Sequence, residues 1–339
     1  DDATREGQSL RLIQEYFMVS AGLQTIVTSY AKMDLPMAQI HEKVAVHIND
    51  THPAMAVPEL MRILIDDYNL EWEVAWATTT KVMSYTNHTV LSEALEKWDA
   101  GLFKEIVPRI YQIVGEIDRQ FVKTWAGKVD ASVIDHTRVI QNGQIHMANL
   151  SIIGGHSVNG VAKLHTELLI EDVLKDFYLL YPEKFNNKTN GIAQRRWSQI
   201  ANPGMSALLD KQIGKGWRSN VHELSKLEEF LDDAAVQHDF YQVKQANKQR
   251  LADFVKKTQG IDLPIHAIFD VQVKRLHAYK RQLLNVMHII KLYQDLKDDP
   301  TLEITPRVFF FGAKAAPGYH FAKSVIKIIN ELANLINQD

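Results

Sequence analysis

A run of basic residues follows an apolar, β-branched segment near the end of the chain. The cations are Lys274, Arg275, His277, Lys280 and Arg281, directly after residues 265–273. We expect them at the first turn of a helix, where cations oppose the helix dipole, so their concentration there is unfavourable unless an anion binds. A phosphate suits both the planar fork of arginine and the point charge of lysine. The alternative interpretation is a solvated basic turn.

A second segment, residues 312–320, occupies the equivalent place after the next apolar segment. Its small residues would let backbone N–H groups approach a ligand closely. Tyr319 could offer an aromatic face to a sugar ring, and His320 could donate hydrogen bonds. The alternative is a tight connecting loop with a core tyrosine. Neither segment has the spacing of a P-loop or a dinucleotide-binding fingerprint.

Two further polar residues, His88 and Asn190, lie in turns flanked by hydrophobic segments. Imidazole and amide groups can fix sugar hydroxyls, although neither residue is diagnostic alone. His41 and His47 are six residues apart, whereas the zincin pattern requires four, and most of the fourteen histidines fail on spacing in the same way. We therefore predict no metal site.

The elements that must position these residues alternate between helix and strand. Apolar periodicity predicts helices over residues 8–32, 55–68, 71–81, 92–121, 158–174, 224–257, 281–296 and 321–336. β-branched runs predict strands at 44–48, 265–273 and 307–311, whereas 84–89 reads as a polar turn. This alternation predicts an α/β fold with parallel sheets and right-handed crossovers. Ligands of such sheets sit beyond the carboxyl ends of the strands.

Length and composition limit the remaining possibilities. The chain has 339 residues, long enough for about two domains. Turn-forming residues at 186–191 predict the domain boundary there. A net charge of −3 gives no general attraction to nucleic acid, and no apolar run is long enough to span a membrane. The absence of cysteine excludes disulfides and thiolate chemistry and fits the cytoplasm, as does an N-terminus that is not a signal peptide.

Six segments in order along the chain resemble the α-glucan (glycogen, starch and maltodextrin) phosphorylases. They are residues 10–17 (LRLIQEYF), 49–53 (NDTHP), 85–91 (YTNHTVL), 187–191 (NKTNG), 269–275 (FDVQVKR) and 314–320 (KAAPGYH). Together they cover essentially the whole chain, which makes the match specific.

The resemblance implies a glycosyltransferase-B (GT-B) architecture, in which two Rossmann-like domains face a cleft. Residues 1–190 would be part of the N-terminal, sugar-binding domain, and 191–339 the start of the C-terminal domain on the phosphate and cofactor side. It implies reversible, retaining phosphorolysis of the terminal α-1,4-linked glucose of glycogen or maltodextrin to α-glucose 1-phosphate. It also implies pyridoxal 5′-phosphate as cofactor, whose phosphate group takes part in the chemistry, and a homodimer.

Site residues follow from the same resemblance. His88 and Asn190 would bind glucose, with the His88 carbonyl facing the anomeric carbon. Arg275 and Lys280 would bind the substrate phosphate, and Lys274 the cofactor phosphate. The remaining candidates are Trp197 near the cofactor, Tyr279 at the sugar, Gly318, Tyr319 and His320 at the acceptor sugar, and Asp2, Asp50 and His277 in the channel.

The sequence also departs from the family pattern. The motif with the cofactor lysine and the upstream glycine loop are not among these residues, so we expect an internal segment of a longer phosphorylase. Ala193 and Gln194 replace the usual Thr-Pro, which leaves the placement of Trp197 open. Thr28 and Ser29 stand where muscle-type enzymes have arginines for AMP, so we expect a bacterial-type enzyme without AMP activation. The alternatives are a catalytically incomplete fragment with partial glucan or phosphate binding, and a nucleotide-sugar glucosyltransferase of the same architecture.

Overall fold

The computed structural model describes residues 4–91 and 94–339. Internal contacts divide the chain into two compact units: an N-terminal unit that ends at Gly191 and a C-terminal unit, Ile192–Asp339. The division falls one residue after the end of the segment 1–190 predicted from the sequence.

A four-stranded parallel sheet organises the N-terminal unit. Its order is β1-β2-β6-β7, and its strands are β1 (Val46–Asn49), β2 (Met83–Thr86), β6 (Val158–Gly160) and β7 (Phe185–Asn187). A small antiparallel sheet, of order β3-β5-β4, comprises β3 (Lys97–Asp99), β4 (Ile140–Gln141) and β5 (Gln144–His146). All neighbours in the larger sheet run parallel, so its strands end at one common edge.

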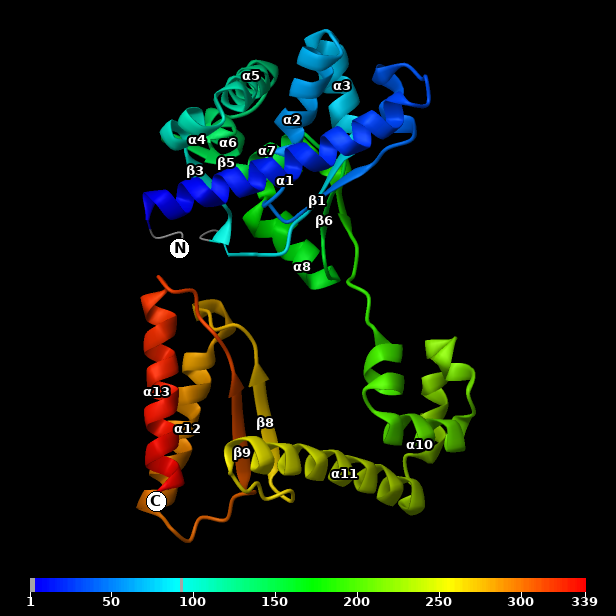
Figure 1. The fold of residues 1–339 in the computed structure, drawn as a ribbon, viewed down its shortest axis with the longest axis vertical. Coiled ribbons are helices and arrows are strands. Elements are labelled where there is room, and N and C mark those ends of the chain that lie inside the picture. Colours follow the sequence, from blue (N-terminus) through cyan, green and yellow to red (C-terminus); the bar gives the residue numbers. More distant parts are fainter. Residues whose placement is uncertain (1–3, 92–93) are drawn as a thin grey trace. The chain divides into compact units, whose positions relative to one another are not determined.

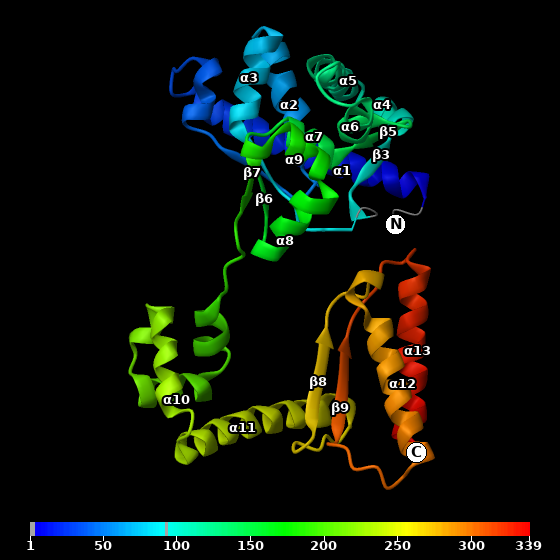
Figure 2. The same ribbon diagram turned by 180° about the vertical axis from the view of Figure 1, so that it is seen from behind.

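Nine α-helices accompany these strands among the described residues of the N-terminal unit (Figures 1 and 2). They are α1 (Arg5–Ala31), α2 (Ala56–Arg62), α3 (Trp72–Val82), α4 (Ala100–Ile106), α5 (Pro108–Trp125), α6 (Ala131–Thr137), α7 (Met147–Ile153), α8 (Lys163–Leu168) and α9 (Lys175–Leu180). α1 packs on α2 and α4, and α2 packs on α5. One continuous hydrophobic core therefore joins the helices to the sheet.

The break between α4 and α5 shows how local sequence sets these elements. The Asp99 carboxylate caps α4 by accepting a 2.7 Å hydrogen bond from Leu102 N. Pro108 then begins α5 at the first helical position, where its missing N–H costs nothing. Ile110, Ile113 and Ile117 recur at helical spacing and are buried.

The C-terminal unit contains a two-stranded parallel sheet and four long helices. Its elements are α10 (Pro203–Ile213), α11 (Ala234–Gln259), β8 (Ile268–Val273), α12 (Gln282–Asp298), β9 (Arg307–Gly312) and α13 (His320–Asn337). β8 and β9 pair from Ile268↔Arg307 to Val273↔Gly312. α12 and α13 lie side by side on one side of this strand pair (Figures 1 and 2). The predicted α/β class with parallel sheets is confirmed.

Four of the predicted segments were wrong in detail. The described part of the predicted helix 92–121 is strand β3 followed by α4 and part of α5, since Pro108 starts a new helix. The segment 158–160 is a strand, not the start of a helix, and residues 84–86 of the predicted polar turn 84–89 belong to strand β2. Of the predicted turn-forming segment 186–191, Asn186 and Asn187 belong to strand β7, because pairing with β6 outweighs their local preference.

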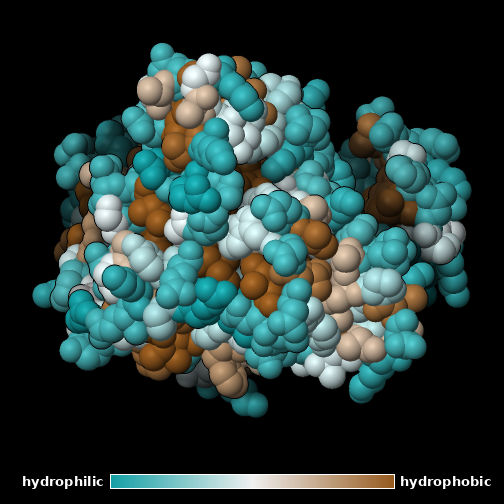
Figure 3. Space-filling view, turned by 90° about the horizontal axis from the view of Figure 1, so that it is seen from above, coloured by the Kyte–Doolittle hydropathy of each residue, from teal (hydrophilic) through white to brown (hydrophobic). Residues whose placement is uncertain are grey.

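None of the described helices is both long and apolar enough to cross a membrane. In the face shown in Figure 3, apolar side chains lie in separate patches among hydrophilic ones.

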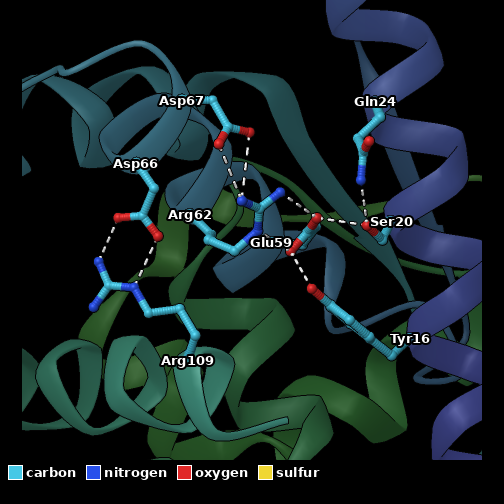
Figure 4. Close-up of polar contacts among 8 residues, drawn as sticks. All are labelled: Tyr16, Ser20, Gln24, Glu59, Arg62, Asp66, Asp67 and Arg109. Atoms are coloured by element: carbon cyan, nitrogen blue, oxygen red, sulfur yellow. Dashed lines mark hydrogen bonds and ion pairs between the residues drawn. The ribbon is translucent and has the colours of Figure 1, made fainter.

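A buried carboxylate joins α1 to α2 (Figure 4). The Glu59 side chain is fully buried and accepts hydrogen bonds from Tyr16 Oη (3.0 Å) and Ser20 Oγ (2.7 Å) of α1. Arg62 donates two more, of 2.9 and 3.0 Å, so the charge of Glu59 is both paired and hydrogen-bonded. Nearby, Asp66 binds Arg109 of α5 through two contacts of 2.5 and 2.8 Å, and these hydrogen bonds lower the pKa of Asp66. Polar pairs thus fix α1 and α5 to the region of α2.

We expect Glu59→Gln to lower the free energy of unfolding by about 3 kcal/mol, because it leaves the half-buried Arg62 guanidinium without its principal counter-charge. Urea denaturation measures this. The matched control is Glu116→Gln, which breaks an exposed i,i+3 pair with Arg119 on α5 and should change stability little. An equal loss in the free energy of unfolding of the two variants would show that the buried ion pair of Glu59 is no more stabilising than the exposed one.

Candidate functional site

The common edge of the four-stranded sheet collects three of the predicted site residues. His88 follows β2, and its Nε2 lies 2.6 Å from Asn49 Oδ1 at the end of β1. Asp50 follows β1 with a positive φ of 63°, and its N–H donates to Thr86 O. Asn190 follows β7, and its N–H donates to Val161 O at 3.0 Å. Parallel pairing therefore brings together residues separated by more than one hundred positions.

A layer of buried polar side chains supports His88. Asn87 is fully buried, donates to Tyr85 Oη (3.2 Å) and accepts from Thr89 N (2.8 Å). Thr86 donates to Asn159 Oδ1 at 2.7 Å, and Asn159 Nδ2 donates to Gly160 O at 2.9 Å. These bonds link β2 to β6 below the edge. Asn159 could not be predicted from the sequence, since its contact with Thr86 depends on strand pairing.

Asp50 also lines a polar pocket of about 510 Å³. The other lining residues come from α1, the segment after β1, and the segment around β3: Gln8, Arg11, Thr51, His52, Ala94, Leu95, Glu96, Lys97, Trp98, Asp99 and Gln144. Trp98 is 6% exposed, and its Nε1 is buried without a hydrogen-bond partner. The pocket is lined by both acidic and basic side chains. Asp50 was the only one of these residues predicted from the sequence.

Two carboxylates share one arginine beside this pocket. Arg11 Nε lies 2.9 Å from Glu15 Oε1, and Arg11 Nη2 lies 2.9 Å from Glu96 Oε1. The Oε2 atoms of both glutamates are buried without partners. Burial, together with the negative charge of Glu96, raises the pKa of Glu15 to about 8. Near neutral pH the pair therefore retains a proton that separate glutamates would release.

This raised pKa gives a pH dependence of stability. Between about pH 4.5 and 8 the unfolded state releases the Glu15 proton while the folded state keeps it, so stability falls as pH rises through this range. Glu15→Gln cannot ionise, so we expect its stability to exceed that of the unsubstituted protein at pH 8 but not at pH 4.5. Urea midpoints measured across the range test this. Parallel pH profiles for the two proteins would contradict it.

The predicted basic cluster lies at the carboxyl edge of β8 and β9. Lys274 and Arg275 directly follow β8, and Lys280 and Arg281 directly precede α12, so the cations lie before the helix and not in its first turn as predicted. All except the half-buried Lys280 are exposed. None of the four forms an ion pair with an acidic side chain of the described residues, and Lys280 Nζ instead lies 5.4 Å from the centre of the Tyr279 ring.

Two side-chain amides, of the buried Gln282 and the half-buried Gln272, hold the backbone of this cluster. Gln282, which is 1% exposed, donates to Arg275 O (3.1 Å) and accepts from His277 N (3.4 Å). Gln272 donates to Lys280 O at 3.2 Å. Arg281 has a φ of 58°, a left-handed conformation that non-glycine residues rarely adopt, and its strain fits a loop held in place by its surroundings.

The second predicted segment meets the first. Leu276 N donates to Lys314 O at 3.1 Å, and Ala278 N donates to Tyr319 Oη at 3.3 Å. The His277 ring lies 4.7 Å from that of Tyr279 and 5.2 Å from that of Tyr319. Tyr319 also packs against the small core around Leu276, so the alternative of a core tyrosine is correct in part.

The remaining candidates lie in different surroundings. Gly318 adjoins Tyr319, and His320 is the first residue of α13. Trp197 is 65% exposed on a π-helical turn, Arg195–Ile200, which packs against α10 instead of joining the basic cluster. Asp2 lies outside the described residues. Within the described ranges there is no group of three or more His, Asp or Glu side chains that could hold a metal ion.

The structure is that of an α/β protein with a cluster of cations, without acidic partners among the described residues, beyond a pair of parallel strands. Comparison with known proteins identifies the family to which this α/β protein belongs. The family model for carbohydrate phosphorylase matches residues 1–339, and the chain belongs to this family. The mixed α/β structure with parallel sheets is consistent with the GT-B fold of that family.

Glycogen phosphorylases of bacteria and animals are among the relatives. The chain is 50% identical to that of Bacillus subtilis (strain 168) over 341 residues, which cover 100% of this chain and 43% of the relative. It is 45% identical to that of Haemophilus influenzae, covering 100% and 42%, and 43% identical to the muscle form of Oryctolagus cuniculus, covering 98% and 41%. The chain therefore spans less than half the length of these relatives.

Proposed function

We propose that the complete protein to which these residues belong catalyses reversible, retaining phosphorolysis of terminal α-1,4-linked glucose, from glycogen or maltodextrin, to α-glucose 1-phosphate. Its partners are the glucan, inorganic phosphate and glucose 1-phosphate. The names of the relatives support this activity. A homodimer and a cytoplasmic location, both expected from the sequence, remain parts of the same proposal.

The observation that carries the proposal is the unpaired basic cluster. Lys274, Arg275 and Arg281 have no acidic partner among the described residues, although they lie close together in sequence on one strand edge. Like charges held together without counter-ions destabilise the protein unless anions bind. Two phosphate groups, one of the substrate and one of the cofactor, would supply the missing negative charge.

The residues of this chain would bind and orient the substrates. Arg275 and Lys280 would hold the substrate phosphate and stabilise the charge that develops on it. His88 and Asn190 would hold the glucose hydroxyls, with the polar layer below β2 keeping His88 in place. Tyr279 and His277 would contact the sugar, and Gly318, Tyr319 and His320 the acceptor sugar. Asp50, with Asp2, would line the channel.

Pyridoxal 5′-phosphate fits the composition of the cluster. Lys274 is exposed and has no ion pair in the described chain, so it is free to contact a cofactor phosphate. Trp197 exposes most of its ring, which would pack near the cofactor. When bound, the cofactor would supply a phosphate group that donates a proton to the substrate phosphate or stabilises its charge. Its Schiff-base lysine is expected outside these residues.

Arg275→Ala tests the phosphate assignment in the complete enzyme. We expect kcat/KM for phosphate to fall about 100-fold, because one charged ligand of the reacting group is lost. The control is Lys256→Ala on α11, which removes an exposed lysine paired with Asp262 and should leave phosphate use unchanged. A normal dependence of rate on phosphate in Arg275→Ala would refute this role.

The cofactor assignment is tested by intact mass before and after borohydride reduction. A mass well above 38.7 kDa with a reduced pyridoxal adduct would support the proposed enzyme. A mass near 38.7 kDa without an adduct would support the alternative, a fragment with partial glucan or phosphate binding.

A further inference from the structure

One half-buried histidine, whose Nε2 atom is buried, lies between the two segments that carry the candidate glucose ligands. His165 lies in α8, directly after β6, and was not among the residues predicted from the sequence. Its Nδ1 accepts a hydrogen bond of 2.9 Å from Val161 N. A ring nitrogen that accepts from a backbone N–H carries no proton, so the neutral ring must hold its proton on Nε2.

The Nδ1 contact leads to Asn190. Val161 donates to His165 through its N–H and accepts from Asn190 N through its carbonyl, at 3.0 Å. One residue, Val161, thus separates the imidazole from the backbone of Asn190. The Lys188 N–H also donates to Gly160 O, at 3.1 Å, so the whole segment that follows β7 is held against the end of β6.

The other ring nitrogen leads to His88. His165 Nε2 is buried and has no partner in ordinary hydrogen-bond geometry. The backbone of Thr89, the residue after His88, interacts with the ring, and its carbonyl oxygen is the group that could accept from Nε2–H. Burial and the neighbouring His88 lower the pKa of His165, which favours the neutral ring. A buried donor left without an acceptor is costly, so a small movement of residues 88–89 that completes this bond would be favourable.

Tight packing keeps α8 in this position. A Cβ on Gly160 would lie 2.4 Å from Thr166 Oγ1 and 3.0 Å from Thr166 Cα, so only glycine allows the approach of α8 to β6. Thr166 in turn donates to Asn187 Oδ1 of β7 at 3.0 Å. The residue next to His165 therefore anchors the helix to both strands.

We propose that His165 is a positioning residue that fixes the His88–Thr89 segment and the Asn190 segment at the separation needed to hold one glucose residue. Its Nδ1 holds Val161 and, through Val161, the backbone of Asn190, and its buried Nε2–H is the donor available to the Thr89 carbonyl. The proposal rests on the proposed function for the identity of the sugar, whereas the arrangement of the imidazole is independent of it.

The tautomer is tested first, on the 339-residue protein. Long-range ¹H–¹⁵N spectra of histidine-labelled protein, with His165→Gln as the assignment control, should show a neutral His165 ring protonated on Nε2. A ring protonated on Nδ1, or one that averages between tautomers, would overturn the proposal. This result does not depend on any enzyme activity.

The positioning role is tested in the complete enzyme by three substitutions. His165→Ala removes both contacts, and we expect kcat/KM for maltoheptaose to fall about 100-fold with KM for phosphate unchanged. Asparagine can replace the Nδ1 acceptor and glutamine the Nε2 donor, so we expect His165→Asn and His165→Gln to lose less. Added imidazole should restore part of the activity of His165→Ala. The control is His136→Ala, which removes an exposed histidine of α6.

The outcomes separate the two claims. An unsubstituted enzyme without phosphorolysis would refute the proposed function, and the tautomer result would then decide the arrangement of His165. An active enzyme in which His165→Ala keeps normal glucan use would overturn the positioning role. A melting temperature that falls equally in all three variants, with phosphate and glucan use impaired alike, would identify His165 as a structural residue only and would also overturn it.

Discussion

Because β1, β2, β6 and β7 run parallel, their carboxyl ends must lie at one edge, and this constraint creates the candidate sugar site. The pairing is continuous from Val46↔Met83 to Gly160↔Asn187. It allows short polar segments, far apart in sequence, to share backbone hydrogen bonds, as Asp50 does with Thr86. The same rule acts in the C-terminal unit, where the parallel pair β8 and β9 brings the basic cluster against the loop of Tyr319.

Sequence reasoning was most successful where one pattern dominated a long segment. The strands predicted at 265–273 and 307–311 are found at Ile268–Val273 and Arg307–Gly312, because each is an apolar, β-branched or aromatic run between polar segments. It failed for the three-residue strands β6 and β7, which are too short to show periodicity. Their strand structure comes from tertiary pairing, which local preference cannot reveal.

The candidate site divides in the same way. Exposed polar residues within recognisable motifs, such as His88 and Arg275, could be predicted because side-chain chemistry and family resemblance both point to them. The roles of Glu96 and His165 could not be predicted. Glu96 pairs with Arg11, which is 85 positions away in the sequence, and His165 accepts a hydrogen bond from a backbone N–H group. No sequence pattern indicates either contact. Such contacts exist only once the fold has formed, so residues that support a site are harder to find than residues that touch a ligand.

The unpaired cations at the edge of β8 have a consequence for the rate of encounter as well as for affinity. The chain as a whole carries a charge of −3, so Lys274, Arg275 and Arg281 form a local positive potential on a weakly negative molecule. Such a region attracts small anions before contact and speeds their diffusion to the surface. The attraction extends over roughly the Debye length, about 8 Å at physiological ionic strength. Association of small anions with this edge should therefore slow as salt is added, even where the final contacts are unaltered.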